Sequence, residues 1–329
     1  MKKALITGGA GFIGFHLANK LLSNHYKIDL LDNFSRGVND QQLSVLKEDS
    51  RVRLLDEDLL TSSIIKELDQ DYDYIFHLAA VIGVQHVLKA PYDVLVKNFV
   101  LLHNALKTAK NQKKIKKFIF ASTSEVYAGT LSSYGLDFPT LESTPLTVNK
   151  LSEERTSYML SKIYGEAMCL HSDLPVTIIR PHNFYGPRMG LSHVIPELMK
   201  KIIETKNGTL DLYSPNHKRT FSFITDAVEM IQLLAESELT IGRSYNLGNE
   251  EEEITMYELA KKIIDLIGKK ITINSLPDTP GSPVRRMPSI SRLKEDVDFV
   301  KAFSLEEGLQ KTFEWYDKEI FSGSEISAL

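Results

Sequence analysis

The chain has 329 residues, 43% apolar and 25% charged, an ordinary composition for a soluble globular protein with one large or two modest domains. A formal net charge of −4 gives no reason to expect a nucleic acid as partner. No membrane partner is expected either, because no apolar run reaches the length of a membrane span, and a glycine turn interrupts the first apolar run too early for a signal peptide.

The first elements predict a phosphate cradle. Residues 3–7 are a short apolar run typical of a buried strand, and residues 12–24 have the apolar spacing of a helix. Gly8, Gly11 and Gly14 follow the strand at three-residue spacing. The first two lie between the strand and the helix, and Gly14 lies in the first turn of the helix. Glycine has no Cβ to block close approach, and the free N–H groups at a helix start face an anion. The turn therefore predicts dinucleotide binding.

The second strand, expected over residues 27–31, ends in Asp32, about 20 residues past the glycines. An acid at this point hydrogen-bonds both ribose hydroxyls of an adenosine and repels a 2′-phosphate, which favours NAD over NADP. Arg36 lies close by and would soften that preference. A purely structural turn would not explain Asp32.

Strands and helices go on alternating through the first half of the chain. Further strands are expected at 52–55, 73–77, 117–121 and 175–180, and helices at 61–69, 93–110 and 153–172. This alternation predicts the α/β class with a doubly wound parallel sheet, the Rossmann arrangement.

The second half of the chain changes character, because prolines break the alternation after residue 180. It shows a helix at 256–267, a Pro/Gly-rich stretch at 277–288 and a helix at 305–317. We expect an NAD-binding domain over 1–180 and a smaller α+β substrate domain over 181–329, with some segments of 215–248 returning to the first domain.

Two groups of side chains predict the chemistry. The strand at 117–121 is followed at its carboxyl end by hydroxyl and carboxylate side chains. Thr123 would relay a proton there, and Glu125 would act as an acid or base. The alternative is a capped turn in which Glu125 is solvated. Tyr158 and Lys162 are four apart on one helix face. A nearby ammonium is expected to lower the pKa of the phenol, so that a tyrosinate takes a hydroxyl proton while a hydride leaves the same carbon.

The remaining reactive side chains predict no further site. Cys169 is the only cysteine, which excludes an internal disulfide and fits a reducing cytoplasm; its helical position favours a buried, inert thiol. His77 is expected to be a packed strand residue, because no second ligand at metal spacing accompanies it. We therefore predict no metal site.

Taken together, the chain resembles the extended short-chain dehydrogenase/reductase family, in particular its nucleotide-sugar epimerases, dehydratases and decarboxylases. The matching segments are residues 7–14, 32–37, 77–80, 122–127, 180–188, 218–226, 244–248 and 285–290, with Asn98, Tyr158 and Lys162. The resemblance implies residue roles. Those around NAD are Gly8, Gly11, Phe12, Ile13, Gly14, Asp32, Asn33, Ser35, Arg36, Asp58, Leu59 (the last two flanking the adenine), Leu78, Ala79, Ala80, Asn98, Tyr158 and Lys162. Those around a nucleoside-diphosphate sugar are Thr123, Asn183, Arg188, Arg219 and Arg286.

The resemblance also implies a reaction that starts by oxidising C4 of the sugar, with Tyr158 as base, Lys162 as its partner and Thr123, Ser124 and Glu125 at the sugar. We place 4,6-dehydration first, with Glu125 removing the C5 proton. A UDP-glucuronate-type decarboxylase and a 4-epimerase are alternatives; Ser124 departs from the Thr-Asp-Glu of many dehydratases. A non-catalytic NAD-sensing protein and a dehydrogenase that releases NADH are further alternatives. Relatives commonly dimerise through two helices per subunit, here 93–110 and 153–172, so a homodimer is expected.

Overall fold

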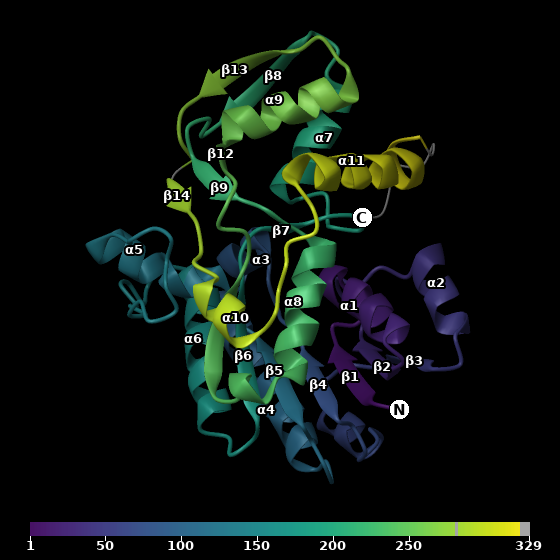
Figure 1. The fold of residues 1–329 in the computed structure, drawn as a ribbon. Helices are drawn as coiled ribbons and strands as arrows, with labels where there is room; N and C mark the ends of the chain where they lie inside the picture. Colours follow the sequence, from purple (N-terminus) through teal and green to yellow (C-terminus); the bar gives the residue numbers. More distant parts are fainter. Residues whose placement is uncertain (280–281, 323–329) are drawn as a thin grey trace.

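A seven-stranded parallel sheet forms the centre of the structure, a computed structural model that describes residues 1–279 and 282–322. Its strand order is β11-β6-β5-β4-β1-β2-β3 (Figure 1). The strands are β1 (Lys3–Thr7), β2 (Lys27–Asp32), β3 (Val52–Asp56), β4 (Tyr74–His77), β5 (Lys117–Ala121), β6 (Val176–Pro181) and β11 (Arg243–Leu247). This sheet confirms the predicted doubly wound fold, because the order reverses direction on either side of β1 and β4.

Helices cover both faces of this sheet. The helices of this part are α1 (Phe12–Ser23), α2 (Gln41–Glu48), α3 (Val84–Lys89), α4 (Pro91–Lys110), α6 (Thr156–Leu170) and α8 (Ile224–Glu236), with 3₁₀ turns η1 (Ser62–Lys66), η2 (Ser124–Tyr127) and η3 (Glu238–Thr240). α5 (Ala128–Tyr134) follows η2 and projects to the side of the sheet (Figure 1). α1 packs against α8, and α4 packs against α6. Alternate residues of β1 enter different cores, Ile6 with the α1–α8 side and Leu5 with the α4–α6 side. The strands are therefore buried on both faces, which explains their continuous apolar runs.

The rest of the chain forms a smaller part beyond the carboxyl ends of the central strands (Figure 1). Its helices are α7 (Val194–Glu204), α9 (Met256–Ile267) and α11 (Leu305–Tyr316), followed by a π-helical turn, η4 (Asp317–Phe321). α10 (Ser291–Asp296) instead packs against β11 of the central sheet (Figure 1). Its short strands are β7 (Phe184–Tyr185), β8 (Thr209–Tyr213), β9 (Lys218–Thr220), β10 (Ser222–Phe223), β12 (Glu253–Thr255), β13 (Thr272–Leu276) and β14 (Arg285–Arg286). Both β11 and α8 belong to the central sheet system, within the expected range 215–248. The division at residue 180 stays a prediction.

Three local expectations differ from the structure. The stretch 61–69 makes only the short turn η1, and the helix expected at 153–172 starts later, at Thr156. α5 was not expected; it opens the segment 128–155 and contacts η2. Part of the Pro/Gly-rich stretch, residues 280–281, lies outside the described residues. Within the described ranges, none of the helices is long and apolar enough to cross a membrane.

Candidate active site

The glycine turn after β1 has the geometry of an anion cradle. α1 begins directly after Gly11, and no side chain caps its first turn, so its N–H groups point out of the turn. A Cβ at Gly14 would lie 2.2 Å from the carbonyl oxygen of Gly8, and Gly8 itself has φ +73°. Glycine is therefore required at both positions, and the residues present fit a dinucleotide pyrophosphate.

Asp32 closes this cradle at the end of β2. Its buried carboxylate accepts hydrogen bonds from the backbone N–H of Ala10 at 3.0 Å and of Phe34 at 2.9 Å. Burial raises the pKa of Asp32, and the two backbone donors partly offset that rise. Asn33 donates to Asp58 at 3.0 Å, which joins the loop after β2 to the loop after β3. The acid expected at the adenosine ribose thus lies against the glycine turn.

The loop after β4 forms the opposite wall. The N–H of Ala79 donates to the hydroxyl of Thr7 at 3.3 Å, and a Cβ at Gly8 would lie 3.0 Å from that nitrogen. Asn98 is buried, accepts from the N–H of Val81 at 2.7 Å and donates to Ser161 at 3.0 Å. It holds this loop against α6, so its contact to a cofactor stays a prediction.

Arg36 reaches further than its place in the sequence indicates. Its Nη1 lies 3.3 Å from the position that a Cβ at Gly83 would take, on the far wall of the cleft. Its positive charge works against the rise that burial causes in the pKa of Tyr158, and it adds to the fall that burial causes in the pKa of His193. Arg36 thus reaches the loop after β4, and its role toward the cofactor stays a prediction.

Tyr158 and Lys162 lie on α6 at the carboxyl end of β5. Lys162 is buried, its Nζ donates to the carbonyl of Ala121 at 2.8 Å, and it lies 5.9 Å from the centroid of the Tyr158 ring. Burial lowers the pKa of Lys162 to about 8. Burial likewise raises the pKa of Tyr158 to about 12, while a hydrogen bond with Thr123 works against that rise and the charge of Glu125 adds to it.

The expected lowering of the Tyr158 pKa is wrong for this structure. The Lys162 ammonium donates to the Ala121 carbonyl beneath the ring, and burial of the phenol outweighs the groups that favour its ionised form.

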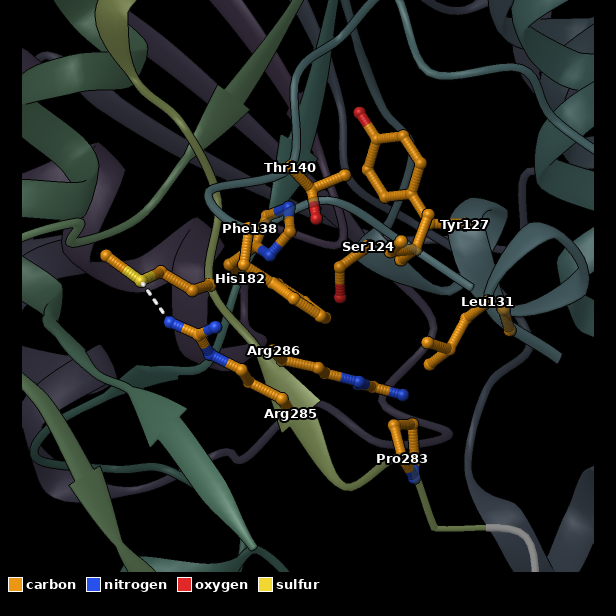
Figure 2. A pocket seen from close by; sticks show the side chains of 12 residues that line it. Ser124, Tyr127, Leu131, Phe138, Thr140, His182, Pro283, Arg285 and Arg286 are labelled. Atoms are coloured by element: carbon orange, nitrogen blue, oxygen red, sulfur yellow. Dashed lines mark hydrogen bonds between the residues drawn. The ribbon is translucent and has the colours of Figure 1, made fainter. Parts of the chain in front are cut away.

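Glu125 meets Arg286 at the sugar side of the site. η2 begins after Thr123, whose hydroxyl accepts from the N–H of Glu125 at 3.2 Å, so the hydroxyl caps the turn that presents the carboxylate. Arg286 donates to this carboxylate from β14, 161 residues along the chain. Ser124 and Arg286 line one cavity (Figure 2). The turn is capped and the Glu125 side chain is 39% exposed, as the alternative expected, but its carboxylate is also paired with a guanidinium.

Arg219 and Asn183 lie at the neighbouring edge. In the parallel pairing of β9 and β14, Arg219 is the register partner of Arg286. Burial and, after it, the charge of Arg286 lower the pKa of Arg219 to about 10. Asn183, with φ +44°, donates to the carbonyl of Thr220 at 2.9 Å. Two adjacent guanidinium groups and an amide suit a diphosphate.

Comparison with known proteins identifies the family to which this chain belongs. The sequence pattern of the NAD dependent epimerase/dehydratase family matches residues 4–248. The chain belongs to this family. It is therefore an NAD-dependent nucleotide-sugar enzyme of the epimerase, dehydratase and decarboxylase group, as the resemblance implied.

Three family members illustrate the similarity. The chain is 32% identical to UDP-N-acetyl-alpha-D-glucosaminuronate decarboxylase of Bacillus cytotoxicus, over 96% of this chain and 98% of the relative. It is 31% identical to UDP-glucuronic acid decarboxylase 1 of Arabidopsis thaliana, over 99% and 72%. A solved variant of UDP-glucuronic acid 4-epimerase from Bacillus cereus, in complex with UDP-4-deoxy-4-fluoro-glucuronic acid and NAD, superposes with a TM-score of 0.82 at 28% identity, over 96% and 99%.

Some residues that the family resemblance assigned lie apart from this site. Arg188 is buried, stacks 3.8 Å from the Phe15 ring centroid and donates to Asp40 at 2.8 Å, so it joins α1, the loop before α2 and the smaller part of the chain. Leu59 is buried in the apolar core beneath the adenine edge. Their roles toward substrate and adenine stay predictions. Cys169 is a buried free thiol, and His77 is buried and hydrogen-bonded to Thr7, as the sequence indicated.

A buried ion pair behind the site was missed by sequence reasoning. Arg180 donates to Glu166 at 2.9 and 2.6 Å, Ser122 donates to Glu166 at 2.5 Å, and Arg180 also donates to the Tyr127 hydroxyl at 2.7 Å. Residues 158, 162 and 166 follow one another at intervals of four, so helical spacing alone places Glu166 on the reactive face of α6. That spacing is the signal that sequence reasoning did not use.

Proposed function

We propose that this enzyme decarboxylates a nucleoside-diphosphate-linked hexuronic acid. The observation that carries the proposal is the ion pair of Arg286 with Glu125 beside Ser124. A guanidinium held at the sugar side by a protein carboxylate binds a second carboxylate through its remaining donors. A uronic acid brings such a carboxylate, whereas a neutral hexose does not.

Oxidation at C4 comes first in this proposal. The chemistry that NAD supplies when bound is acceptance of a hydride and its later return. Tyr158 takes the proton of the C4 hydroxyl, directly or through the hydroxyl of Thr123, with which it shares a hydrogen bond. Lys162 donates to the Ala121 carbonyl and lies close to the phenol ring of Tyr158.

The ketone then makes loss of C6 possible, because the carboxylate is β to it. The C5–C6 bond breaks, its electron pair passes into the C4 carbonyl as an enolate, and carbon dioxide leaves. A proton adds to C5, the C4 ketone takes back the hydride, and Tyr158 returns its proton to the C4 oxygen. The net reaction consumes one proton and releases one carbon dioxide.

We propose decarboxylation ahead of the 4,6-dehydration that the sequence predicts. Loss of water from C6 needs a proton for the departing hydroxyl, and Ser124 is not a carboxylic acid, so Glu125 alone would have to take the C5 proton and deliver it to C6. Carbon dioxide leaves without a proton. The decarboxylase names of two relatives at 31–32% identity support the same choice.

We also propose where the nucleoside diphosphate binds. Arg219 and Asn183 border Arg286, and the Arg219 guanidinium is anchored by donation to the carbonyl of Lys218 at 2.7 Å and of Pro283 at 2.5 Å. This pre-organised donor set would hold the diphosphate, with the sugar directed toward Thr123 and Tyr158.

Incubation of the purified protein with UDP-, GDP-, CDP- and dTDP-linked hexoses and hexuronic acids, followed by mass spectrometry, tests the proposal. We expect loss of carbon dioxide from a uronic acid. Loss of water from a hexose would establish a dehydratase, and altered stereochemistry at constant mass an epimerase. Accumulation of free NADH would establish a dehydrogenase, and NAD binding without turnover of any sugar would support a sensor.

Variants at the ion pair sharpen that test. Arg286→Gln should raise KM for the uronic acid by about 10- to 100-fold, since one charge-assisted contact is lost. Arg243→Gln is the control, because Arg243 pairs with Asp296 at 2.9 Å away from this cavity. Equal effects of both variants would contradict the role of Arg286.

We further propose a homodimer formed by α4 and α6. These helices pack side by side, and one face of α4 exposes Tyr92, Val96 and Phe99 at intervals of four and three residues. A second copy would cover this face. The cytoplasm, expected from the single buried thiol of Cys169, stays a proposal as well.

A further inference from the structure

His182 lies in the chain directly after β6, at the back of the cavity that Ser124 and Arg286 line (Figure 2). It is 3% exposed, and its ring centroid lies 6.2 Å from that of Tyr127. The apolar side chains of Leu131 and Phe138 form the outer wall of the same cavity. Nothing in the steps proposed above uses this histidine.

The hydrogen bonds around Asn246 determine the tautomer of His182. The Asn246 amide nitrogen donates to the carbonyl of Thr140 at 2.9 Å, so Asn246 Oδ1 is an acceptor, which also receives the Tyr127 hydroxyl at 2.8 Å. His182 Nε2 lies 3.3 Å from that oxygen and must therefore carry the hydrogen. Nδ1 is left as a lone-pair acceptor.

This acceptor is buried and unused. Among the residues that the structure describes, none donates a hydrogen bond to His182 Nδ1. Burial lowers the pKa of His182 to about 3, and the charges of Arg286 and Arg180 lower it too, against the Asn246 hydrogen bond. The ring is therefore neutral near pH 7, and the lone pair has no protein donor among the described residues. A buried polar atom without a partner is unfavourable unless a ligand satisfies it.

We infer that His182 is a specificity-determining residue, whose Nδ1 accepts a hydrogen bond from a hydroxyl or acylamino N–H group of the bound sugar. The inference rests on the proposed function and names the part of the substrate that this cavity recognises. A lone pair repels a carboxylate, so the uronic carboxylate would face Arg286 while a donor faces His182. Within one cavity, Arg286 would thus bind the carboxylate of the sugar and His182 its hydrogen-bond donor.

The apolar wall narrows the choice of donor. Leu131 and Phe138 come from the segment 128–155, which is unusually long, and Leu136 lies beside them in the cavity lining. An acylamino group presents an N–H next to a methyl group, which this wall would cover, whereas a hydroxyl presents only the donor. Both groups share the donor chemistry, and the experiment separates them.

Two substitutions isolate the lone pair from the structural bond. In His182→Gln the amide nitrogen takes the place of Nε2 and keeps the donation to Asn246, but the acceptor at Nδ1 is lost. In His182→Asn the amide oxygen takes the place of Nδ1 and keeps the acceptor, but the bond to Asn246 is lost. A purely structural histidine would be harmed more by the second change.

Calorimetric binding of UDP-glucuronic acid and UDP-N-acetylglucosaminuronic acid, in a Tyr158→Phe background that prevents turnover, gives the readout. We expect His182→Gln to weaken sugar-nucleotide binding about tenfold, as for one lost hydrogen bond, and His182→Asn to bind within about twofold of the parent. A loss confined to the acetamido sugar supports the N–H donor, and a loss on both sugars supports a hydroxyl.

UDP alone serves as control, and all variants should bind it equally. Unchanged affinity of His182→Gln for both sugars, or a larger loss in His182→Asn, would overturn the inference. Neither result depends on carbon dioxide release by the wild-type protein, so failure of the proposed decarboxylation would be recognised separately.

Discussion

Arg219 and Arg286 are register partners between β9 and β14, which places two guanidinium groups side by side at the edge of the site. Two neighbouring positive charges repel each other. Burial and the charge of Arg286 therefore lower the pKa of Arg219 to about 10. Such a pair is unfavourable in an empty site and is relieved by an anion. A diphosphate bound at Arg219 would offset this repulsion, while Arg286, paired with Glu125, faces the sugar.

The first prediction concerns this pair. Arg219→Gln should weaken UDP binding by about 10- to 100-fold, because charge-assisted hydrogen bonds to a phosphate are lost. Isothermal titration calorimetry with UDP measures the effect. Arg243→Gln is the control, since Arg243 pairs with Asp296 at the surface; similar losses in both variants would argue against a diphosphate site at Arg219.

The second prediction concerns the base. Tyr158→Phe should retain NAD but lower the rate of sugar-dependent NADH formation by at least about a hundredfold, which is the usual contribution of a positioned acid or base. Fluorescence of the bound nucleotide measures both properties. Tyr164→Phe, on the same helix, should leave the rate unchanged. Turnover of the Tyr158 variant at the wild-type rate would remove this residue from the mechanism.

The third prediction is a pH dependence. Because burial raises the pKa of Tyr158 to about 12, the phenolate is the minor form at neutral pH and its fraction grows as pH rises. We expect NADH formation under single-turnover conditions to accelerate about tenfold per pH unit through the neutral range, as for any base far below its pKa. A rate independent of pH there would contradict the elevated pKa.

The fourth prediction concerns the buried ion pair behind the site. Glu166→Ala leaves the Arg180 guanidinium without its carboxylate, and an uncompensated buried charge costs about 3–5 kcal/mol of stability. Thermal unfolding should shift markedly to lower temperature. The exposed pair of Lys201 with Glu197 provides the contrast, since Glu197→Ala should cost at most about 1 kcal/mol. Equal shifts would show that the Arg180 pair contributes no more than a surface pair.

The fifth prediction concerns assembly. Phe99→Glu places a charge in the middle of the exposed face of α4 and should convert a dimer to a monomer, because burying an unpaired carboxylate is unfavourable. Light scattering after size-exclusion chromatography gives the mass. Tyr257→Glu, on α9 in the smaller part of the chain, should not change it. A wild-type protein that is already monomeric would refute the interface.

Local sequence determined the parts of this protein that depend on near neighbours in the chain. Apolar runs predicted six strands of the central sheet, all but β11, the glycine spacing predicted the turn that a Cβ at Gly14 would destroy, and the four-residue interval joined Tyr158 to Lys162. Each of these follows from backbone geometry over a few residues, so no other segment is needed to specify it.

Only the tertiary structure decided the rest. Arg286 meets Glu125 across 161 residues, Arg36 crosses the cleft to Gly83, and His182 is left with an unused lone pair because Asn246 occupies its other nitrogen. Burial, which periodicity does not quantify, raises the Tyr158 pKa instead of lowering it. The physical reason is common to all of them: charge pairing and desolvation depend on which distant segments pack together, and that is a property of the folded chain.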